Sequence, residues 1–192
     1  HYIGPVVNYL TLAGVGTTTS EALGNLEQTI YLTPINYNIN YNGNGATSGS
    51  TAAKNCYYDE THTIHQNGYS REYTVTYDGN GGIASVASQK ASYTFAGWGM
   101  NQANTVNYAA GASFKNLTAV SNGVVTMNAI WKPASVMLST ATRTGYRFDG
   151  WDIGKAGASY TPTKNVTAKA KWTANTYRVV LDPKNGGAQQ TI

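Results

Sequence analysis

The chain has 192 residues, of which 41% are hydrophobic and only 11% are charged, whereas about 25% of an average soluble domain is charged. Its 15 tyrosines and four tryptophans provide apolar surface for a packed core, which excludes an intrinsically disordered chain. The net charge of +4 comes from scattered basic residues; because nucleic-acid binding needs them clustered, we expect no nucleic-acid partner.

Two further classes of protein are excluded by composition. The chain contains one cysteine, Cys56, so an internal disulfide framework cannot form. No run of residues approaches the roughly 18 apolar residues of a membrane span, so we expect no membrane insertion. A polar but uncharged composition rich in Tyr, Asn and Thr is typical of a secreted or surface β-protein rather than a cytosolic enzyme.

The first 35 residues predict a β-rich segment. "YIGPVVNYLTLAG" indicates a pair of strands broken at Pro5, and "TSEALGNLEQ" offers a short helix that Gly24 weakens. "TIYLTP", residues 29–34, resembles the closing strand of a degenerate unit. We interpret residues 1–35 as a degenerate module or a cap.

One strand-and-turn pattern then occurs three times in the chain. The copies are "YNINYNGNGA" from Tyr37, "YTVTYDGNGG" from Tyr73 and "YRVVLDPKNGG" from Tyr177. In each copy, apolar or aromatic residues alternate with others, which predicts a strand with one buried face. Turn signals follow at once, Asn42-Gly43 and Asp78-Gly79 in the first two copies. Because both residue types accept positive φ, each copy predicts a tight hairpin.

Two stretches of the sequence contain residue types that could bind a metal ion, but their spacing does not favour a metal site. "CYYDETHTIH" groups residue types that zinc accepts: Cys56, Asp59, Glu60, His62 and His65. Two histidines three residues apart face opposite sides of a strand, however, so we predict no metal site. "DGNGG" does not predict a calcium loop either, because Gln89 stands where such a loop needs a glutamate. No nucleophile or carboxylate-pair motif is visible, so we predict no catalytic residues and no cofactor.

Two aromatic motifs recur after the hairpins. "YTFAGW" at 93–98 matches "YRFDGW" at 146–151, and "MNAIW" at 127–131 matches "AKAKW" at 168–172. Phe95 and Trp98 are an odd number of residues apart, so a regular strand would point them to opposite faces. Gly97, like Gly150, is therefore predicted to host a bulge that turns both rings inward. The predicted core residues are Tyr73, Val75, Tyr77, Phe95, Trp98, Trp131, Phe148, Trp151 and Trp172.

Hairpin, Phe-x-Gly-Trp motif and closing Ala-x-Trp strand, in this order over residues 73–132, resemble the Listeria–Bacteroides repeat, the B-repeat of internalin-type surface proteins. The resemblance extends over roughly residues 36–192. It implies a mainly β fold, with small α+β modules similar to the β-grasp fold in tandem. It also implies an extracellular location on the bacterial cell surface, where such modules form stalks, spacers or adhesive segments.

Five segments follow from the motifs. Residues 1–35 are the N-terminal segment, 36–72 a partial repeat with the first hairpin, and 73–132 a complete module. Residues 133–172 form a partial repeat with the Phe-x-Gly-Trp half, and 173–192 an orphan hairpin. Half a module cannot bury its apolar face alone. Either 36–72 pairs with 133–172, or the last hairpin completes 133–172 or a neighbouring molecule, or the sequence stops inside a longer array.

The expected function is therefore non-enzymatic. We expect a structural stalk, spacer or adhesin whose partners are neighbouring repeats or copies of itself. A first alternative is a filament subunit that assembles through its C-terminal hairpin, with the assembly strand formed by Tyr177, Val179 and Leu181. A second alternative is a module that binds a host glycan or protein through exposed tyrosines.

Overall fold

The computed structural model describes residues 35–101, 104–181, 184, 186 and 190–191. The chain divides into two compact units, His1–Thr33 and Pro34–Ile192. Apart from Ile35, the predicted N-terminal segment 1–35 lies outside the described residues. All that follows concerns the second unit.

Strands are the only regular elements among the described residues. They are β1 (Asn36–Asn42), β2 (Ser48–Gly49), β3 (Lys54–Tyr57), β4 (His62–Thr63), β5 (Tyr69–Ser70), β6 (Glu72–Asp78), β7 (Ile83–Ala84), β8 (Ser88–Ser92), β9 (Thr94–Met100), β10 (Ser113–Phe114), β11 (Gly123–Lys132), β12 (Val136–Met137), β13 (Ala141–Thr142), β14 (Tyr146–Trp151), β15 (Ser159–Tyr160), β16 (Val166–Ala174), β17 (Val180–Leu181) and β18 (Gln190–Thr191). The mainly β prediction is confirmed, but the β-grasp detail is not, because no described segment is a helix.

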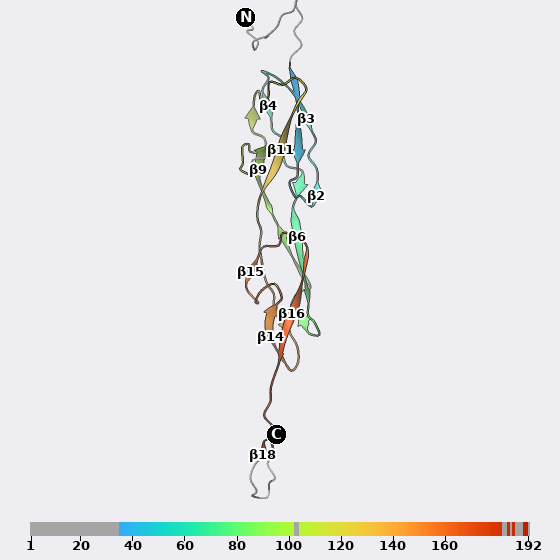
Figure 1. Ribbon diagram of the computed structural model, residues 1–192, viewed down its shortest axis with the longest axis vertical. Helices are drawn as coiled ribbons and strands as arrows, with labels where there is room; N and C mark the ends of the chain where they lie inside the picture. The colour runs from blue at the N-terminus through green and yellow to red at the C-terminus, as the bar shows by residue number, and fades with distance from the viewer. Residues whose placement is uncertain (1–34, 102–103, 182–183, 185, 187–189, 192) are drawn as a thin grey trace, which may run out of the picture. The chain divides into compact units, whose positions relative to one another are not determined.

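The first four-stranded sheet has the order β3-β1-β11-β9. In Figure 1 the blue β1 runs beside the yellow β11, and the two are parallel from the pair Tyr37↔Gly123 to the pair Asn42↔Asn128. β3 and β9 flank them in antiparallel pairing. The short pairs β4–β10 and β2–β5 belong to the same part of the chain. We call this assembly, residues 35–71 and 93–132, the first module.

The second sheet repeats this arrangement in the order β14-β16-β6-β8. Its central strands β6 and β16 are parallel, with Val75 opposite Val166 and Tyr77 opposite Ala168 (Figure 1). The separate short pairs β7–β13 and β12–β15 belong to the same part of the molecule. We call residues 72–92 and 133–174 the second module.

Each module has its own core because strand alternation gives one apolar face. Side chains of β1 and β11 alternate between buried and outward positions along most of their length. The core of the first module contains Tyr37, Ile39, Tyr41, Cys56, Ile64, Trp98, Phe114, Val125, Met127 and Ala129. The core of the second contains Val75, Tyr77, Ala91, Val136, Leu138, Ala141, Trp151, Ala168 and Ala170.

The modules do not follow the segments that the motifs predict. Residues 73–92 form β6–β8 and pair with β16, whereas residues 94–132 supply β9 and β11 and pair with β1. The segment 73–132 is therefore divided between two sheets and is not a module by itself. Likewise, 36–72 pairs with the second half of 73–132 and not with 133–172. The reason is that the two hairpins show the same alternation, so the motifs do not state which closing strand each one pairs with.

The same backbone hydrogen bond marks the corresponding place in both modules. The amide of Tyr146 donates to the carbonyl of Arg143 at 3.1 Å, closing a short turn through Thr144 and Gly145. In the first module, the amide of Tyr93 donates to the carbonyl of Arg71 at 2.8 Å, but residues 72–92 lie between the two. The hairpin β6–β8 is thus inserted into the first module at a position where the second has an uninterrupted turn. Loop tips tolerate such insertions well.

The predicted bulges are present in both Phe-x-Gly-Trp strands. β9 pairs Gly97 with Ile130 and then Phe95 with Trp131, so Ala96 is the extra residue. Gly97 adopts φ 145°. The ring centroids of Phe95 and Trp98 consequently lie 5.0 Å apart. β14 has the same register shift at Asp149, and the Phe148 and Trp151 rings are 5.2 Å apart.

Candidate functional site

The "GNGG" turn of the second module is a tight turn held by its own backbone. Asn80 and Gly81 have φ of 45° and 84°, and the amide of Gly82 donates to the carbonyl of Gly79 at 2.9 Å. The Asp78 carboxylate accepts a hydrogen bond from the Asn80 amide at 2.9 Å. Positive φ at both central residues is the geometry that matches strand twist in hairpins. A tight turn is present, but its centre is Asn80-Gly81 rather than Asp78-Gly79. The predicted tight hairpin is wrong, because β6 pairs with β8, beginning with Thr76 opposite Ser88, and the turn is only part of a longer connection.

The closing strand clamps this turn through two side chains. The Asn80 side-chain amide donates to the Ala170 carbonyl at 3.0 Å, and the indole N–H of Trp172 donates to the Gly79 carbonyl at 3.0 Å. The first module repeats both bonds, from Asn44 to Ala129 at 2.8 Å and from Trp131 to Gly43 at 2.9 Å. The terminal tryptophan of each Ala-x-Trp motif therefore fastens the hairpin turn to the last strand of its module.

An arginine covers the outer side of each turn. The Arg71 guanidinium donates to the Asn44 carbonyl at 3.3 Å, and that of Arg143 donates to the Asn80 carbonyl at 3.4 Å. Each guanidinium also lies over a tyrosine ring, Tyr93 at 4.8 Å and Tyr146 at 3.8 Å from the ring centroid. Such cation–π contacts are favourable by roughly 0.5–1 kcal/mol at exposed sites.

Residues of the second module complete this arrangement in the first. The Arg71 guanidinium donates to the Tyr73 hydroxyl at 3.2 Å, and the Tyr73 ring meets the Tyr93 ring edge-on at 5.6 Å. The Tyr93 hydroxyl donates to the Pro162 carbonyl at 2.9 Å. Tyr73 and Pro162 belong to the second module, so the tyrosine of "YTFAGW" joins the two modules. We call this group, Arg71, Tyr73 and Tyr93, the junction stack.

The base of the inserted hairpin carries an ion pair beside the junction stack. Glu72 contacts the Lys90 ammonium at 2.8 Å and accepts a hydrogen bond from the Ser92 hydroxyl at 2.8 Å. The hydrogen bonds from Lys90 and Ser92 lower the pKa of the Glu72 carboxyl below its ordinary value. Nearby, the Thr74 amide donates to the side chain of Asn165 at 2.8 Å.

A groove lies beside the turn in each module, and the two differ in size. In the first module it has a volume of about 210 Å³ and is lined partly by Glu72 and Ser92 of the inserted hairpin. In the second module the corresponding groove has a volume of about 690 Å³. Its lining includes Gly81, Ile83, Arg143, Tyr146, Phe148 and Trp172. The larger groove therefore lies where the second module has no inserted hairpin.

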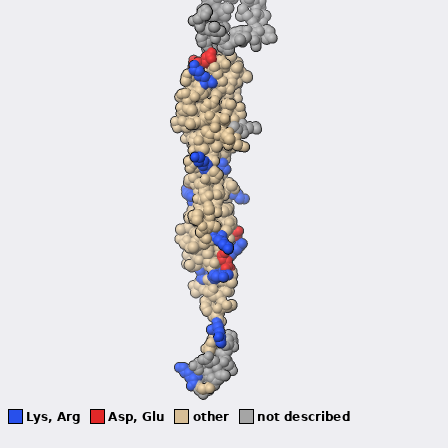
Figure 2. Space-filling model, turned by 90° about the vertical axis from the view of Figure 1, so that its left-hand side faces the viewer, with Lys and Arg blue, Asp and Glu red and all other residues tan. Residues whose placement is uncertain are grey.

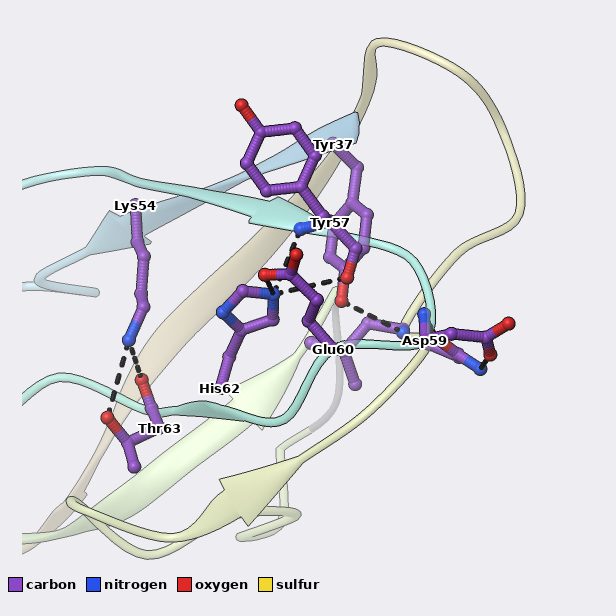
Figure 3. Close-up of polar contacts among 9 residues, drawn as sticks. Tyr37, Lys54, Tyr57, Asp59, Glu60, His62 and Thr63 are labelled. Carbon is purple, nitrogen blue, oxygen red and sulfur yellow. Dashed lines mark hydrogen bonds and ion pairs between the residues drawn. The ribbon is translucent and has the colours of Figure 1, made fainter. Parts of the chain in front are cut away.

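The structure does not bring the candidate metal ligands together. Figure 3 shows His62 beside Tyr57, whose amide donates to the imidazole Nε2 at 2.9 Å, with Glu60 at 3.8 Å. Asp59 contacts Asn116 instead. Cys56 is fully buried, and burial raises the pKa of its thiol. Within the described residues, no group of three or more His, Cys, Asp or Glu side chains is arranged to hold a metal ion.

Most of the aromatic residues chosen from the sequence lie in or against the two cores. Val75, Tyr77, Trp98 and Trp151 are buried, and a second set packs against them half-buried: Phe95, Trp131, Phe148 and Trp172. Tyr73 is half-buried in the junction stack rather than in a core. Of the assembly-strand residues, Tyr177 is 74% exposed and Val179 50% exposed. Leu181 lies in β17, opposite Gln190.

Sequence analysis missed the arginines and the clamping amides. Arg71 and Arg143 stand in different sequence contexts, "GYSRE" and "ATRTG", so no motif links them. Asn44 and Asn80 do recur within "GNG", and the repetition of an amide at that position was a usable signal.

The surface carries few charges. On the face shown in Figure 2, lysine and arginine side chains are separated by uncharged surface, and few acidic groups lie among them. None of the described residues belongs to a helix long and apolar enough to cross a membrane.

Comparison with known families identifies one match. Residues 118–173 match the family model of the Listeria-Bacteroides repeat domain. This match supports the repeat family that the recurring motifs suggest. The matched residues contribute β11 to the first module and β12–β16 to the second, so the sequence repeat and the folded module are offset. Neither a curated protein nor a solved structure matches the chain.

Proposed function

We propose that residues 36–174 are a load-bearing, non-enzymatic stalk or spacer of a bacterial cell-surface protein. The observation that carries this proposal is the parallel pairing of the first and last strands of each module, β1 with β11 and β6 with β16. The Listeria-Bacteroides repeat in the chain supports an extracellular surface location. The partners of such a stalk are the neighbouring repeats.

Parallel terminal strands resist tension because of the direction in which they are pulled. Force that enters β1 at Asn36 and leaves β11 at Lys132 slides one strand along the other. All hydrogen bonds of the ladder then carry the load together instead of breaking one at a time. β6 and β16 have the same geometry between Glu72 and Ala174. Forced unfolding is governed by the unfolding rate, so a shared ladder raises the rupture force.

Pulling the full chain by optical tweezers or atomic force microscopy tests this role. Handles at Asn36 and Ala174 load both parallel pairs in shear, whereas handles at Asn36 and Tyr57 peel β3 from β1, where those two residues are opposite each other. We expect a clearly higher rupture force in the first geometry. Equal rupture forces in the two geometries would contradict a load-bearing role.

In the natural chain the two modules are interleaved, because each is built from two segments that are separated by part of the other. A rewired chain without this interleaving provides the matched control. In it, Arg71 is joined to Tyr93 through Thr-Gly, copying the turn at Thr144-Gly145, and residues 72–92 are moved to lie between 132 and 133. Every strand pair is retained, but each module becomes continuous in sequence. Chain rearrangements at surface turns are generally tolerated.

The lengths released distinguish the two chains. In the natural chain, the module that opens first releases only about 40 residues, roughly 130 Å. Its other segment is a loop whose two ends are held by the module that is still folded, so this segment is not stretched. In the rewired chain, each module releases all of its residues at once, roughly 260 Å and 210 Å. Identical release patterns would show that the natural modules are not interleaved under load.

A further inference from the structure

Each module has an arginine stacked on a tyrosine beside its turn, and this pair is covered in the first module but uncovered in the second. In the first, Arg71 and Tyr93 are covered by Tyr73, whose hydroxyl also lies 3.5 Å from the Gly45 carbonyl of the clamped turn. Tyr93 is consequently half-buried. Its counterpart Tyr146 is 37% exposed, and among the described residues its hydroxyl has no hydrogen-bond partner.

The groove of the second module presents the same chemistry without a cover. Gly81, Arg143 and Tyr146 line it in the places that Gly45, Arg71 and Tyr93 take in the first module. The aromatic edges of Phe148 and Trp172 form its apolar part. A groove that combines an arginine stacked on a tyrosine with the turn residue Gly81 suits an incoming phenol, which supplies a ring and a donor.

The chain itself presents such a phenol five residues beyond Trp172, the last residue that lines the groove. Tyr177 begins the third copy of the hairpin pattern, as Tyr73 begins the second. The amide of Asn175 donates to the Gly145 carbonyl at 2.9 Å, which holds the chain next to Tyr146. Tyr177 is 74% exposed and followed by the exposed Val179 and Val180. Exposed apolar side chains beside an uncovered aromatic groove favour contact between the two.

We propose that the groove lined by Arg143, Tyr146 and Trp172 is the docking surface for Tyr177 of the same chain. Tyr177 then takes the place in the second module that Tyr73 takes in the first. This docking extends the junction stack from one repeat to the next and rests on the proposed stalk role. The two are tested separately, because docking is measured without force.

Nitration of the full chain by tetranitromethane, read by mass spectrometry, tests the proposal. Without docking, Tyr177 reacts faster than Tyr57, because 74% of Tyr177 but only 42% of Tyr57 is exposed. With docking, Tyr177 reacts more slowly than Tyr57. A docked population of about ten to one slows the nitration of Tyr177 about tenfold relative to the undocked chain.

Arg143→Ala provides the undocked reference. This variant removes the guanidinium that lines the groove, and we expect the nitration rate of Tyr177 to rise by about tenfold while that of Tyr57 stays constant. Circular dichroism and tryptophan fluorescence check that the variant is folded. Arg147→Ala, a charge removed from the neighbouring strand position outside the groove, is the matched control and leaves the rate unchanged.

Two outcomes overturn the proposal. One is a Tyr177 that reacts faster than Tyr57 in the natural chain and is insensitive to Arg143→Ala. The other is protection that disappears on tenfold dilution of the protein, which would place the hairpin of a second copy in the groove. Rupture forces from the pulling experiment are unaffected by either outcome, because the handles at Asn36 and Ala174 exclude Tyr177.

Discussion

Asn80 serves the turn of the second module in two ways. Its backbone adopts a φ of 45°, which Asn tolerates better than most residues. Its side chain donates to the Ala170 carbonyl and so ties the turn to the closing strand. Asn44 does the same in the first module. The recurrence of both properties gives a structural reason for the repetition of "GNG".

Substitution of Asn80 separates the two contributions. Asn80→Gly keeps positive φ but loses the side-chain donor, so we expect a loss of about 1 kcal/mol in the free energy of unfolding. Asn80→Ala also places a β-carbon at positive φ and is expected to cost about 2–3 kcal/mol in total. Urea denaturation measures both. Equal losses for the two variants would show that φ at this position is unimportant.

The ion pair at Glu72 predicts a dependence of stability on pH. Its pKa is lowered in the folded state, so its contribution to stability is present above the ordinary pKa of a glutamate. It is lost as pH falls through the folded-state pKa. We expect the urea midpoints of the natural chain and Glu72→Gln to differ at pH 7 and to converge once the pH falls below the folded-state pKa of Glu72. A difference that persists at the lower pH would assign the effect to packing. Ser88→Ala, at the far end of β8 from Ser92, is the control.

At the scale of elements, the bulged strand β9 makes two rings share one face. Alternation alone would send Phe95 and Trp98 to opposite sides of the sheet. The extra residue Ala96 corrects this, and Gly97 follows it with a positive φ of 145°. Space is also limited, since a β-carbon on Gly97 would lie 2.5 Å from the Val106 side chain.

Gly97→Ala should therefore destabilise the first module more than an alanine at an open glycine. Gly157 is the matched control, because it has a φ of 75° and no atom within 4 Å of an added β-carbon. We expect Gly157→Ala to cost about 1 kcal/mol from φ alone and Gly97→Ala about 2–4 kcal/mol, from φ and overpacking together. Chemical denaturation monitored by tryptophan fluorescence, to which both modules contribute, measures the difference. Equal costs would show that the bulge can relax around a β-carbon.

At the scale of residues 35–174, the chain passes between the modules at 71–72, 92–93 and 132–133. In each module, the segment with the first strand and the segment with the last strand are consequently separated along the chain by part of the other module. If the first module unfolds, the two parts of the second remain connected by about 40 flexible residues. Closing a loop of that length costs about 3 kcal/mol. The stability of the second module therefore depends on the first without any requirement for a large interface.

Trp98→Ala tests this dependence. Trp98 is fully buried in the first module, and its truncation should cost about 3–5 kcal/mol. We expect hydrogen exchange to accelerate in β16 of the second module as well as in β11 of the first. Val124→Ala, at an exposed position of the first module, should change neither. Faster exchange confined to the first module would show that the modules unfold independently.

The sequence alone determined the local structure. Alternation predicted the strands around Val75 and Ile39, the glycine-rich stretches predicted tight turns two residues before their observed centres, and the odd spacing of Phe95 and Trp98 predicted a bulge. These features depend on neighbours within a few residues, so the chain encodes them directly. The repeated motifs also pointed to the family whose model matches residues 118–173.

Only the tertiary structure decided which hairpin pairs with which closing strand. β6 has the same alternation as β1, and β16 the same as β11, so a motif cannot state its partner. Pairing depends on contacts between residues far apart in sequence, such as Val75 with Val166 and Tyr37 with Gly123. The arginines on the turns escaped prediction for the same reason. Their role comes from the position of a side chain in space, and two different sequence contexts reach that position.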